Sequence, residues 1–185
     1  MDSLLIKNAK IINEGNIFVG DILIEGEIIS SISNKINIDS RTEVIDADGL
    51  LLIPGMIDDQ VHFREPGFTH KGNISSESKA AIAGGVTSYI EMPNTNPNTT
   101  TIKEFNKKIK IATNNSYSNF SFMFGGTNDN INEIKKIDPS EVAGIKLFLG
   151  SSTGKMLIDN LNSIENIFSS TSLPISAHCE DEQTI

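Results

Sequence analysis

Cysteine and long apolar runs are nearly missing from this chain of 185 residues. Its single cysteine, Cys179, excludes a framework of internal disulfides. No apolar run approaches the roughly 20 residues that a membrane-spanning helix requires. The first residues, Met1 to Leu4, carry neither the basic segment nor the apolar stretch of a secretory signal. These absences predict a cytoplasmic protein that does not enter a membrane.

Basic residues are also fewer than acidic ones. The chain has 15 lysines and arginines against 24 acidic residues, a formal net charge of -9. Nucleic acids and acidic membranes attract basic surfaces, so both are excluded as expected partners. The acidic balance indicates no particular ligand. With 38% hydrophobic and 21% charged residues, the composition is that of a globular protein with a core.

Residues 1–53 form a first region, in which short runs rich in isoleucine alternate with polar turns. The turns Glu14-Gly15-Asn16 and Glu25-Gly26-Glu27 separate apolar runs such as Ile17-Phe18-Val19. Short apolar runs with glycine turns between them predict strands and hairpins. We therefore expect a small, β-sandwich-like unit over residues 1–53.

Residues 54–185 form a second region, in which strand patterns alternate with helical ones. Thr101 and Glu104 have the spacing of a capping box, and alternating phenylalanines at 120, 122 and 124 predict a strand. A helix is expected over Ile131–Ile137, a strand over Ala143–Leu149, and a last strand over Pro174–His178. About five strands joined by helices predict a parallel sheet, either open or closed into a barrel.

Three predicted strand ends carry side chains that could do chemistry. His62 shares a strand face with Gln60, Lys146 lies opposite Ile145 and Leu147, and His178 ends the last strand. A lone histidine is more often structural, and Lys146 could equally lie at an edge in solvent. Catalytic groups collect at the C-terminal ends of barrel strands, so one shared metal site is the alternative. The residues alone leave both interpretations open.

Six motifs, in order along almost the whole chain, resemble dihydroorotases of the amidohydrolase superfamily. They are Pro54-Gly-Met-Ile-Asp58, His62-Phe-Arg-Glu-Pro-Gly67, Ala83-Gly-Gly-Val-Thr87, Glu91-Met-Pro-Asn-Thr95, Gly144-Ile-Lys146 and Ala177-His-Cys-Glu-Asp181. The resemblance implies an α/β fold: a small N-terminal β unit, then the first part of a metal-dependent (β/α)8 barrel, truncated after about five strands. It implies zinc-dependent, reversible hydrolysis of L-dihydroorotate to N-carbamoyl-L-aspartate in pyrimidine biosynthesis.

The resemblance also implies roles for individual residues. His62 and His178 would be zinc ligands, and Lys146 would carry a carbamate that bridges two zinc ions. Arg64 and Asn94 would hold the substrate carboxylate, Arg64 through its forked guanidinium. The zinc ions would lower the pKa of a water molecule and polarise the substrate carbonyl. Besides the small-molecule substrate, the implied partners are a second copy of the chain or another enzyme of pyrimidine synthesis.

Two departures from the family pattern leave alternatives open. Gln60 stands where the family has the first histidine of a His-x-His pair, so Gln60 is either a weak ligand or a hydrogen-bonding neighbour of the site. The site would then hold one zinc ion, hold two, or be degenerate. The chain also ends at Ile185, before the family's later histidine ligand and its aspartate general base. No catalytic base can be named, and the 185-residue chain alone is expected to be inactive.

Other functions fit the same motifs. One alternative is another cyclic amidohydrolase, namely a dihydropyrimidinase, hydantoinase or allantoinase, although Arg64 and the Met92-Pro-Asn-Thr95 motif favour dihydroorotase. Another is a non-catalytic, dihydroorotase-like scaffold protein, which Gln60 favours and the retained Lys146 and His178 oppose. The loop Gly150–Gly154 is either a lid that touches substrate or a plain connection.

Overall fold

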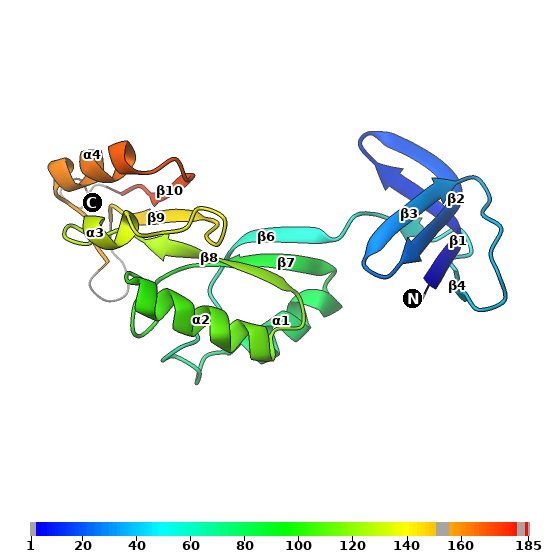
Figure 1. Ribbon diagram of the computed structural model, residues 1–185, viewed down its shortest axis with the longest axis horizontal. Helices are drawn as coiled ribbons and strands as arrows, with labels where there is room; N and C mark the ends of the chain where they lie inside the picture. Colours follow the sequence, from blue (N-terminus) through cyan, green and yellow to red (C-terminus); the bar gives the residue numbers. More distant parts are fainter. Residues whose placement is uncertain (1–2, 151–155, 181–183, 185) are drawn as a thin grey trace. The chain divides into compact units, whose positions relative to one another are not determined.

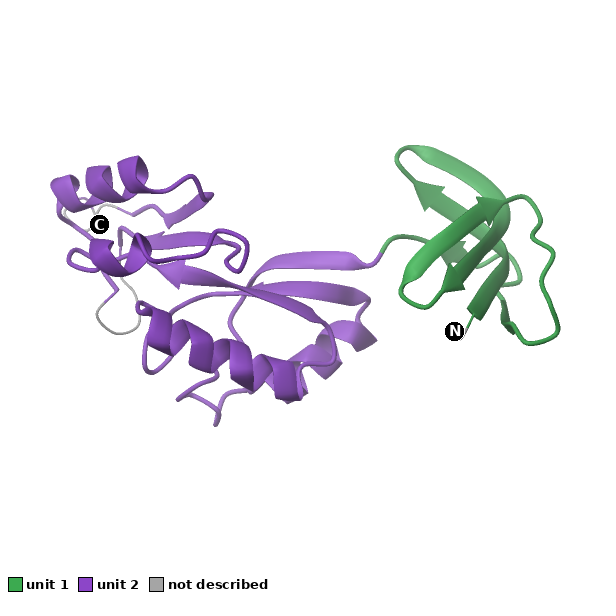
Figure 2. Ribbon diagram, in the orientation of Figure 1, with its two compact units in different colours: residues 1–54 green, residues 55–185 purple. Residues whose placement is uncertain are grey.

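The computed structural model describes residues 3–150, 156–180 and 184 of the chain. The chain divides into two compact units, Met1–Pro54 and Gly55–Ile185 (Figure 2). No helix in the described ranges has the length and apolar character needed to cross a membrane.

The first unit is a mixed five-stranded sheet. Its strands are β1 (Ser3–Asn13), β2 (Asn16–Glu25), β3 (Ile28–Ser33), β4 (Glu43–Asp46) and β5 (Leu51–Leu52). Strand β1 pairs antiparallel with β2 and parallel with both β4 and β5, while β3 pairs with the other side of β2. Gly15 and Gly26 have positive φ in the two hairpin turns that the sequence predicts, a conformation that glycine adopts without steric cost.

The core of the first unit is small. Its buried members are Ala9, Ile11, Ile22 and Ala47. Asp21 is also buried, and its carboxylate accepts hydrogen bonds from the backbone N–H groups of Asn8 and Ile36 at 3.0 and 2.9 Å. The Asp21 carboxylate in β2 therefore links strand β1, at Asn8, and the segment at Ile36 to strand β2.

The second unit is a parallel sheet whose strands alternate with helices along the chain (Figure 1). The strand order is β10-β9-β8-β7-β6, so each new strand is added beside the previous one. The elements are β6 (Met56–Val61), α1 (Ile74–Ala83), β7 (Val86–Glu91), α2 (Ile102–Asn115), β8 (Asn119–Gly125), α3 (Ile131–Ile134), β9 (Gly144–Phe148), α4 (Leu161–Ser170) and β10 (Ile175–His178). This confirms the predicted alternation of five strands with helices.

Polar side chains cap the starts of helices α1 and α2 in the second unit. Asn73 accepts a hydrogen bond from the N–H of Ser76 at 2.9 Å, and Thr101 accepts from the N–H of Glu104 at 3.2 Å. Each contact satisfies one of the N–H groups that a helix start leaves free. The predicted helix over Ile131–Ile137 is shorter than expected. Helix α3 ends at Ile134, four residues before Asp138, whose neighbour Pro139 disfavours helical backbone.

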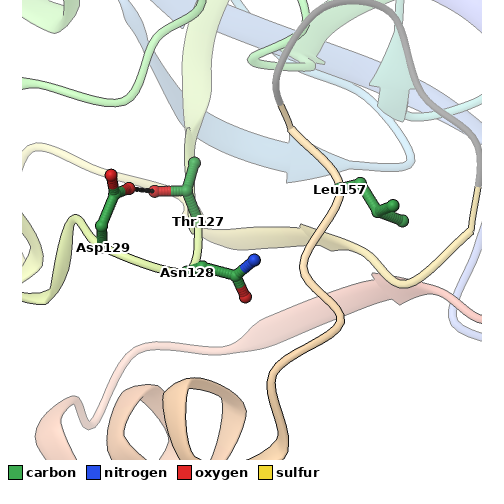
Figure 3. Close-up of a pocket in the computed structure, with 4 residues that line it drawn as sticks. All are labelled: Thr127, Asn128, Asp129 and Leu157. Atoms are coloured by element: carbon green, nitrogen blue, oxygen red, sulfur yellow. Dashed lines mark hydrogen bonds between the residues drawn. The ribbon is translucent and has the colours of Figure 1, made fainter.

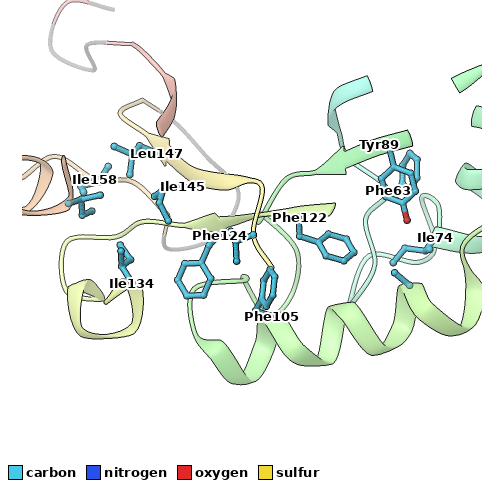
Figure 4. Packing of buried hydrophobic residues seen from close by; sticks show 13 residues of the cluster. Phe63, Ile74, Tyr89, Phe105, Phe122, Phe124, Ile134, Ile145, Leu147 and Ile158 are labelled. Carbon is cyan, nitrogen blue, oxygen red and sulfur yellow. The ribbon is translucent and has the colours of Figure 1, made fainter. Parts of the chain in front are cut away.

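The core of the second unit lies between the sheet and its helices (Figure 4). Phe105 of α2 packs against Phe122 and Phe124 of β8, with ring centroids 6.4 and 6.2 Å apart. Ile145 and Leu147 of β9 are fully buried in the same cluster. One face of the strands is thereby covered by helices, and the side chains of the opposite face are left for the site.

Candidate functional site

The candidate residues lie at the C-terminal ends of four parallel strands. His62 follows β6, Asn94 follows β7, Lys146 lies in β9, and His178 ends β10. In a parallel sheet these ends meet at one edge. The two predicted ligands Lys146 and His178 are brought close by the pairing of their strands, in which His178 stands opposite Phe148.

A contact between Gln60 and Lys146 shows that the sheet is strongly curved. Lys146 Nζ donates to Gln60 Oε1 at 3.4 Å, although two strands separate β6 from β9. Three strand spacings span about 14 Å, and side chains stand roughly perpendicular to a sheet. On a flat sheet the two side chains would not meet. They therefore share the concave face of a barrel wall.

Lys146 is buried with few partners. Its side chain points away from Ile145 and Leu147, as the alternation predicts, and its residue is only 3% exposed. Apart from Gln60, its ammonium lies 5.4 Å from the centre of the Phe148 ring. Burial lowers the pKa of Lys146, because the charged form loses its water. No carboxylate forms an ion pair with it in the described part of the chain.

His62 is oriented by Asn94. The ring Nδ1 lies 2.9 Å from Asn94 Oδ1, so with this amide orientation Nδ1 carries the proton and Nε2 keeps its lone pair. Desolvation lowers the pKa of His62, the nearby charges of Arg64 and Lys146 lower it further, and the bond to Asn94 raises it. Burial and the nearby positive charges favour a neutral imidazole, and the contact with Asn94 fixes its tautomer, so that Nε2 could bind a metal. Sequence reasoning assigned Asn94 to the substrate and missed this contact.

Arg64 lies in a constrained turn after β6. Its φ is +70°, a left-handed conformation that is uncommon for residues other than glycine, and its carbonyl accepts from Phe68 N–H at 2.9 Å. The turn packs against the loop after β7: Pro66 O accepts from Asn96 N–H at 3.0 Å, and a Cβ at Gly67 would collide with Asn96. Within the described ranges no carboxylate pairs with the Arg64 guanidinium. It can therefore receive an anionic ligand.

His178 has two neighbours that the sequence did not indicate as site residues. The Phe148 ring stacks on it at a centroid distance of 6.4 Å, and Glu180 Oε1 lies 3.0 Å from its Nε2. Phe148 thus lies beside both Lys146 and His178. The predicted lid or connection at Gly150–Gly154 falls, apart from Gly150, outside the described residues.

A buried ion pair lies behind the strand ends. Glu91 Oε2 is 2.7 Å from Lys108 Nζ, and both side chains are almost fully inaccessible to solvent. Burial raises the pKa of Glu91 and lowers that of Lys108, while each charge opposes the shift of the other. Sequence reasoning included Glu91 in a motif but gave neither Glu91 nor Lys108 a role. The available signal was spacing, since Lys108 falls on the same helical face as Phe105 and Ala112.

The geometry is that of one wall of a barrel, and comparison with known proteins gives its family. The model of the "Dihydro-orotase-like" family matches residues 49–183. The chain belongs to this family. It is 37% identical over 188 residues to a dihydroorotase of Methanosphaera stadtmanae and 36% identical over 188 residues to one of Staphylococcus epidermidis. These matches cover 100% and 98% of the chain but 42% and 43% of the relatives, so the chain spans under half of their length.

Solved structures give the same fold for this dihydroorotase-like chain. An L-hydantoinase from Arthrobacter aurescens superposes with a TM-score of 0.92 at 29% identity, over 99% of the chain and 42% of the hydantoinase. A dihydropyrimidinase from Brevibacillus agri superposes with a TM-score of 0.82 at 22% identity, over 98% of the chain and 41% of its own. The expected fold class, a truncated amidohydrolase barrel with a small N-terminal β unit, is confirmed.

The donor set fits a metal site in part. His62 offers Nε2, and Lys146 is a buried amine without an anionic partner, which a carbamate would convert into an anionic oxygen ligand. Gln60 offers only a neutral amide oxygen. In the described part of the chain no group of three or more His, Cys, Asp or Glu side chains is placed to hold a metal. A complete metal site would require a modified Lys146 and further ligands.

A separate pocket of about 270 Å³ lies near the end of β8, lined by Thr127, Asn128, Asp129 and Leu157 (Figure 3). Thr127 donates to Asp129 at 2.9 Å, and Asn128 donates to Asp159 at 2.9 Å. Its polar side chains are thus already hydrogen-bonded within the protein, and none of the candidate site residues lines the pocket. We assign it no role in the chemistry.

Proposed function

We propose that the chain is the N-terminal part of a dihydroorotase, which hydrolyses L-dihydroorotate reversibly to N-carbamoyl-L-aspartate with the help of zinc. The observation that carries the proposal is the arrangement of Arg64, Asn94, His62 and Lys146 at one strand-end edge of a dihydroorotase-like barrel wall. The match to relatives named dihydroorotase along the whole chain supports it.

Arg64 is the residue that favours this substrate. L-dihydroorotate differs from dihydrouracil by a carboxylate, and a guanidinium without a carboxylate partner binds such a group through two parallel hydrogen bonds. The left-handed turn at Arg64 is held by the Phe68 N–H and by packing against Asn96, so the guanidinium is presented from a fixed backbone. Pre-organisation of this kind lowers the entropic cost of binding.

His62, Lys146 and His178 would hold the metal. Zinc at this place supplies a Lewis acid that polarises the amide carbonyl and lowers the pKa of water. Asn94 keeps the Nδ1 proton of His62 in place and so directs Nε2 toward a ligand. Gln60 holds Lys146 Nζ on the concave face. His178 would exchange Glu180 for the metal as the partner of its Nε2. We propose none of the described residues as the general base.

Two other functions each have an observation in their favour. The TM-score of 0.92 against an L-hydantoinase favours another cyclic amidohydrolase. Gln60, in place of a histidine ligand, favours a non-catalytic scaffold.

A chimera can decide among the three. The 185 residues replace the corresponding part of the Methanosphaera stadtmanae dihydroorotase, which supplies the remaining length. We expect the zinc-loaded chimera to turn over L-dihydroorotate and to form it from N-carbamoyl-L-aspartate. Preference for hydantoin or dihydrouracil would instead show another cyclic amidohydrolase. A folded, zinc-loaded chimera without turnover would favour the scaffold, with the Gln60→His variant as the control for a missing ligand.

A further inference from the structure

Glu65, the residue after Arg64, ties the turn that follows β6 to helix α1. Its Oε2 accepts a hydrogen bond from the backbone N–H of Ile74 at 2.8 Å. Ile74 is the first residue of α1, and its side chain is fully buried in the core of the second unit. The Glu65 carboxylate therefore links the turn directly to a part of the protein that is held in place by packing.

Helix α1 has a cap of its own besides this contact. Asn73 accepts from the N–H of Ser76 at 2.9 Å, and the Ser76 side chain completes a capping box. The contact at Ile74 adds a carboxylate near the positive end of the helix dipole, where a negative charge is favoured. What Glu65 supplies beyond the cap is a connection from the helix start to the turn nine residues earlier.

The same contact keeps the Glu65 carboxylate away from the guanidinium of its neighbour. The carboxylate is engaged at Ile74, and among the residues that the structure describes Arg64 forms no ion pair. A carboxylate that paired with Arg64 would compete with an anionic ligand, because both would use the same two parallel N–H groups. The position of Glu65 thus leaves the guanidinium available.

Two other hydrogen bonds hold the turn. Phe68 N–H donates to Arg64 O at 2.9 Å and closes the turn on itself, while Asn96 N–H donates to Pro66 O at 3.0 Å and joins it to the loop after β7. Glu65 adds the link to α1. The backbone that carries Arg64 is therefore tied to the elements on both sides of β7 in the sequence.

We infer that Glu65 is a positioning residue: bound at the start of α1, its carboxylate fixes the turn that presents Arg64 and stays clear of the Arg64 guanidinium. Because the peptide unit between the two residues is planar, anchoring Glu65 restricts the backbone orientation of Arg64. The consequence for substrate binding rests on the proposed function of Arg64. The anchoring of the turn is a property of the chain.

Amide hydrogen exchange in the 185-residue chain, without metal or substrate, tests the anchoring. Glu65→Met keeps the length of the side chain but has no acceptor oxygen. We expect the Phe68 and Asn96 amides to exchange about 10-fold faster in this variant, the effect of losing one hydrogen bond to a charged group. The Ile145 amide, which donates to Pro174 O at 2.9 Å, should keep its rate because the loss is local. Glu65→Gln retains an acceptor and should restore rates close to those of the wild type.

Glu77→Met is the matched control. Glu77 lies in the first turn of the same helix, and its carboxylate accepts from the Ser76 hydroxyl at 2.8 Å. This variant should leave the exchange of Phe68 and Asn96 unchanged. Wild-type exchange at both amides in a folded Glu65→Met variant would overturn the proposal, and so would an equal effect of Glu77→Met. If Glu65→Met fails to fold, the same criterion applies to Glu65→Asp, whose carboxylate is one methylene further from Ile74.

Steady-state kinetics of the zinc-loaded chimera test the consequence for Arg64. Glu65→Met should raise KM for L-dihydroorotate about 10-fold or more and leave KM for dihydrouracil unchanged, because only the first substrate has a carboxylate for Arg64 to bind. Glu65→Gln should again lie near the wild type. Faster exchange with an unaltered KM in an active chimera would make Glu65 a purely structural anchor and would overturn the positioning role. An inactive chimera would count against the proposed function, and the exchange rates would still decide whether Glu65 fixes the turn.

Discussion

Replacing Lys146 with methionine is expected to stabilise the isolated chain. The ammonium is buried on the concave face with one hydrogen-bond acceptor, Gln60 Oε1, at 3.4 Å, and has no anionic partner in the described part of the chain. Removing a buried polar group that is poorly partnered typically recovers about 1–2 kcal/mol. For a unit of this size that corresponds to a rise in melting temperature of roughly 3–8 °C.

The same substitution at Lys108 should have the opposite sign. Lys108 is as deeply buried, but its ammonium has Glu91 at 2.7 Å and the Met92 carbonyl at 2.9 Å. Lys108→Met leaves the Glu91 carboxylate buried without its partner, which costs about 3–5 kcal/mol. Lys107→Met, on the exposed side of the same helix, is the control and should change stability by no more than about 0.5 kcal/mol.

Urea unfolding followed by circular dichroism measures all three variants, since the chain has no tryptophan to report by fluorescence. The expected order of stability is Lys146→Met above wild type and Lys107→Met, with Lys108→Met lowest. A destabilisation of more than about 1 kcal/mol by Lys146→Met would refute the reasoning, because it would mean that the ammonium is well satisfied in the folded chain.

Three further predictions concern function, acid stability and packing. In the chimera, Lys146→Ala should lower both zinc content, by elemental analysis, and turnover by at least about 100-fold, and retained zinc and rate would exclude a bridging carbamate. Glu133 accepts hydrogen bonds from Lys136 and from the Ile102 N–H, and both lower the pKa of its carboxyl group. The carboxylate therefore adds to the free energy of unfolding above its unfolded-state pKa of about 4.3, and this contribution is lost as the pH falls through the folded-state pKa. Glu133→Gln should therefore flatten the acid limb of stability against pH, and an unchanged limb would refute this. Phe122→Ala, in the fully buried core of the second unit, should cost about 3–5 kcal/mol by urea unfolding, and a cost below about 1 kcal/mol would show that the site is not close-packed.

Much of the second unit could be predicted from local patterns. The alternation of Ile145, Lys146 and Leu147 correctly predicts which side chains pack under the helices, because successive residues of a strand face opposite ways. The glycine turns of the first unit and the helix cap at Thr101 were equally predictable, because a turn or a helix start depends on a few adjacent residues.

Contacts that depend on curvature could not be predicted in this way. Gln60 and Lys146 are 86 positions apart and meet only because the sheet curves across two intervening strands. The contact between His62 and Asn94 likewise depends on how two loops pack, and the Glu91–Lys108 pair contradicts the usual rule that charged side chains stay exposed. Periodicity places such residues on a face but does not give their partners.

The most direct test of the proposed dihydroorotase is the ratio of kcat/KM for L-dihydroorotate to kcat/KM for dihydrouracil in the zinc-loaded chimera, before and after Arg64→Met. The two substrates differ by the carboxylate that Arg64 is proposed to bind. Because a site built to pair with a polar group discriminates strongly against a ligand that lacks it, we expect the ratio to fall by about 100-fold or more while turnover of dihydrouracil is unchanged. A ratio that Arg64→Met leaves unaltered would contradict the account, since Arg64 would then not be the group that selects the substrate.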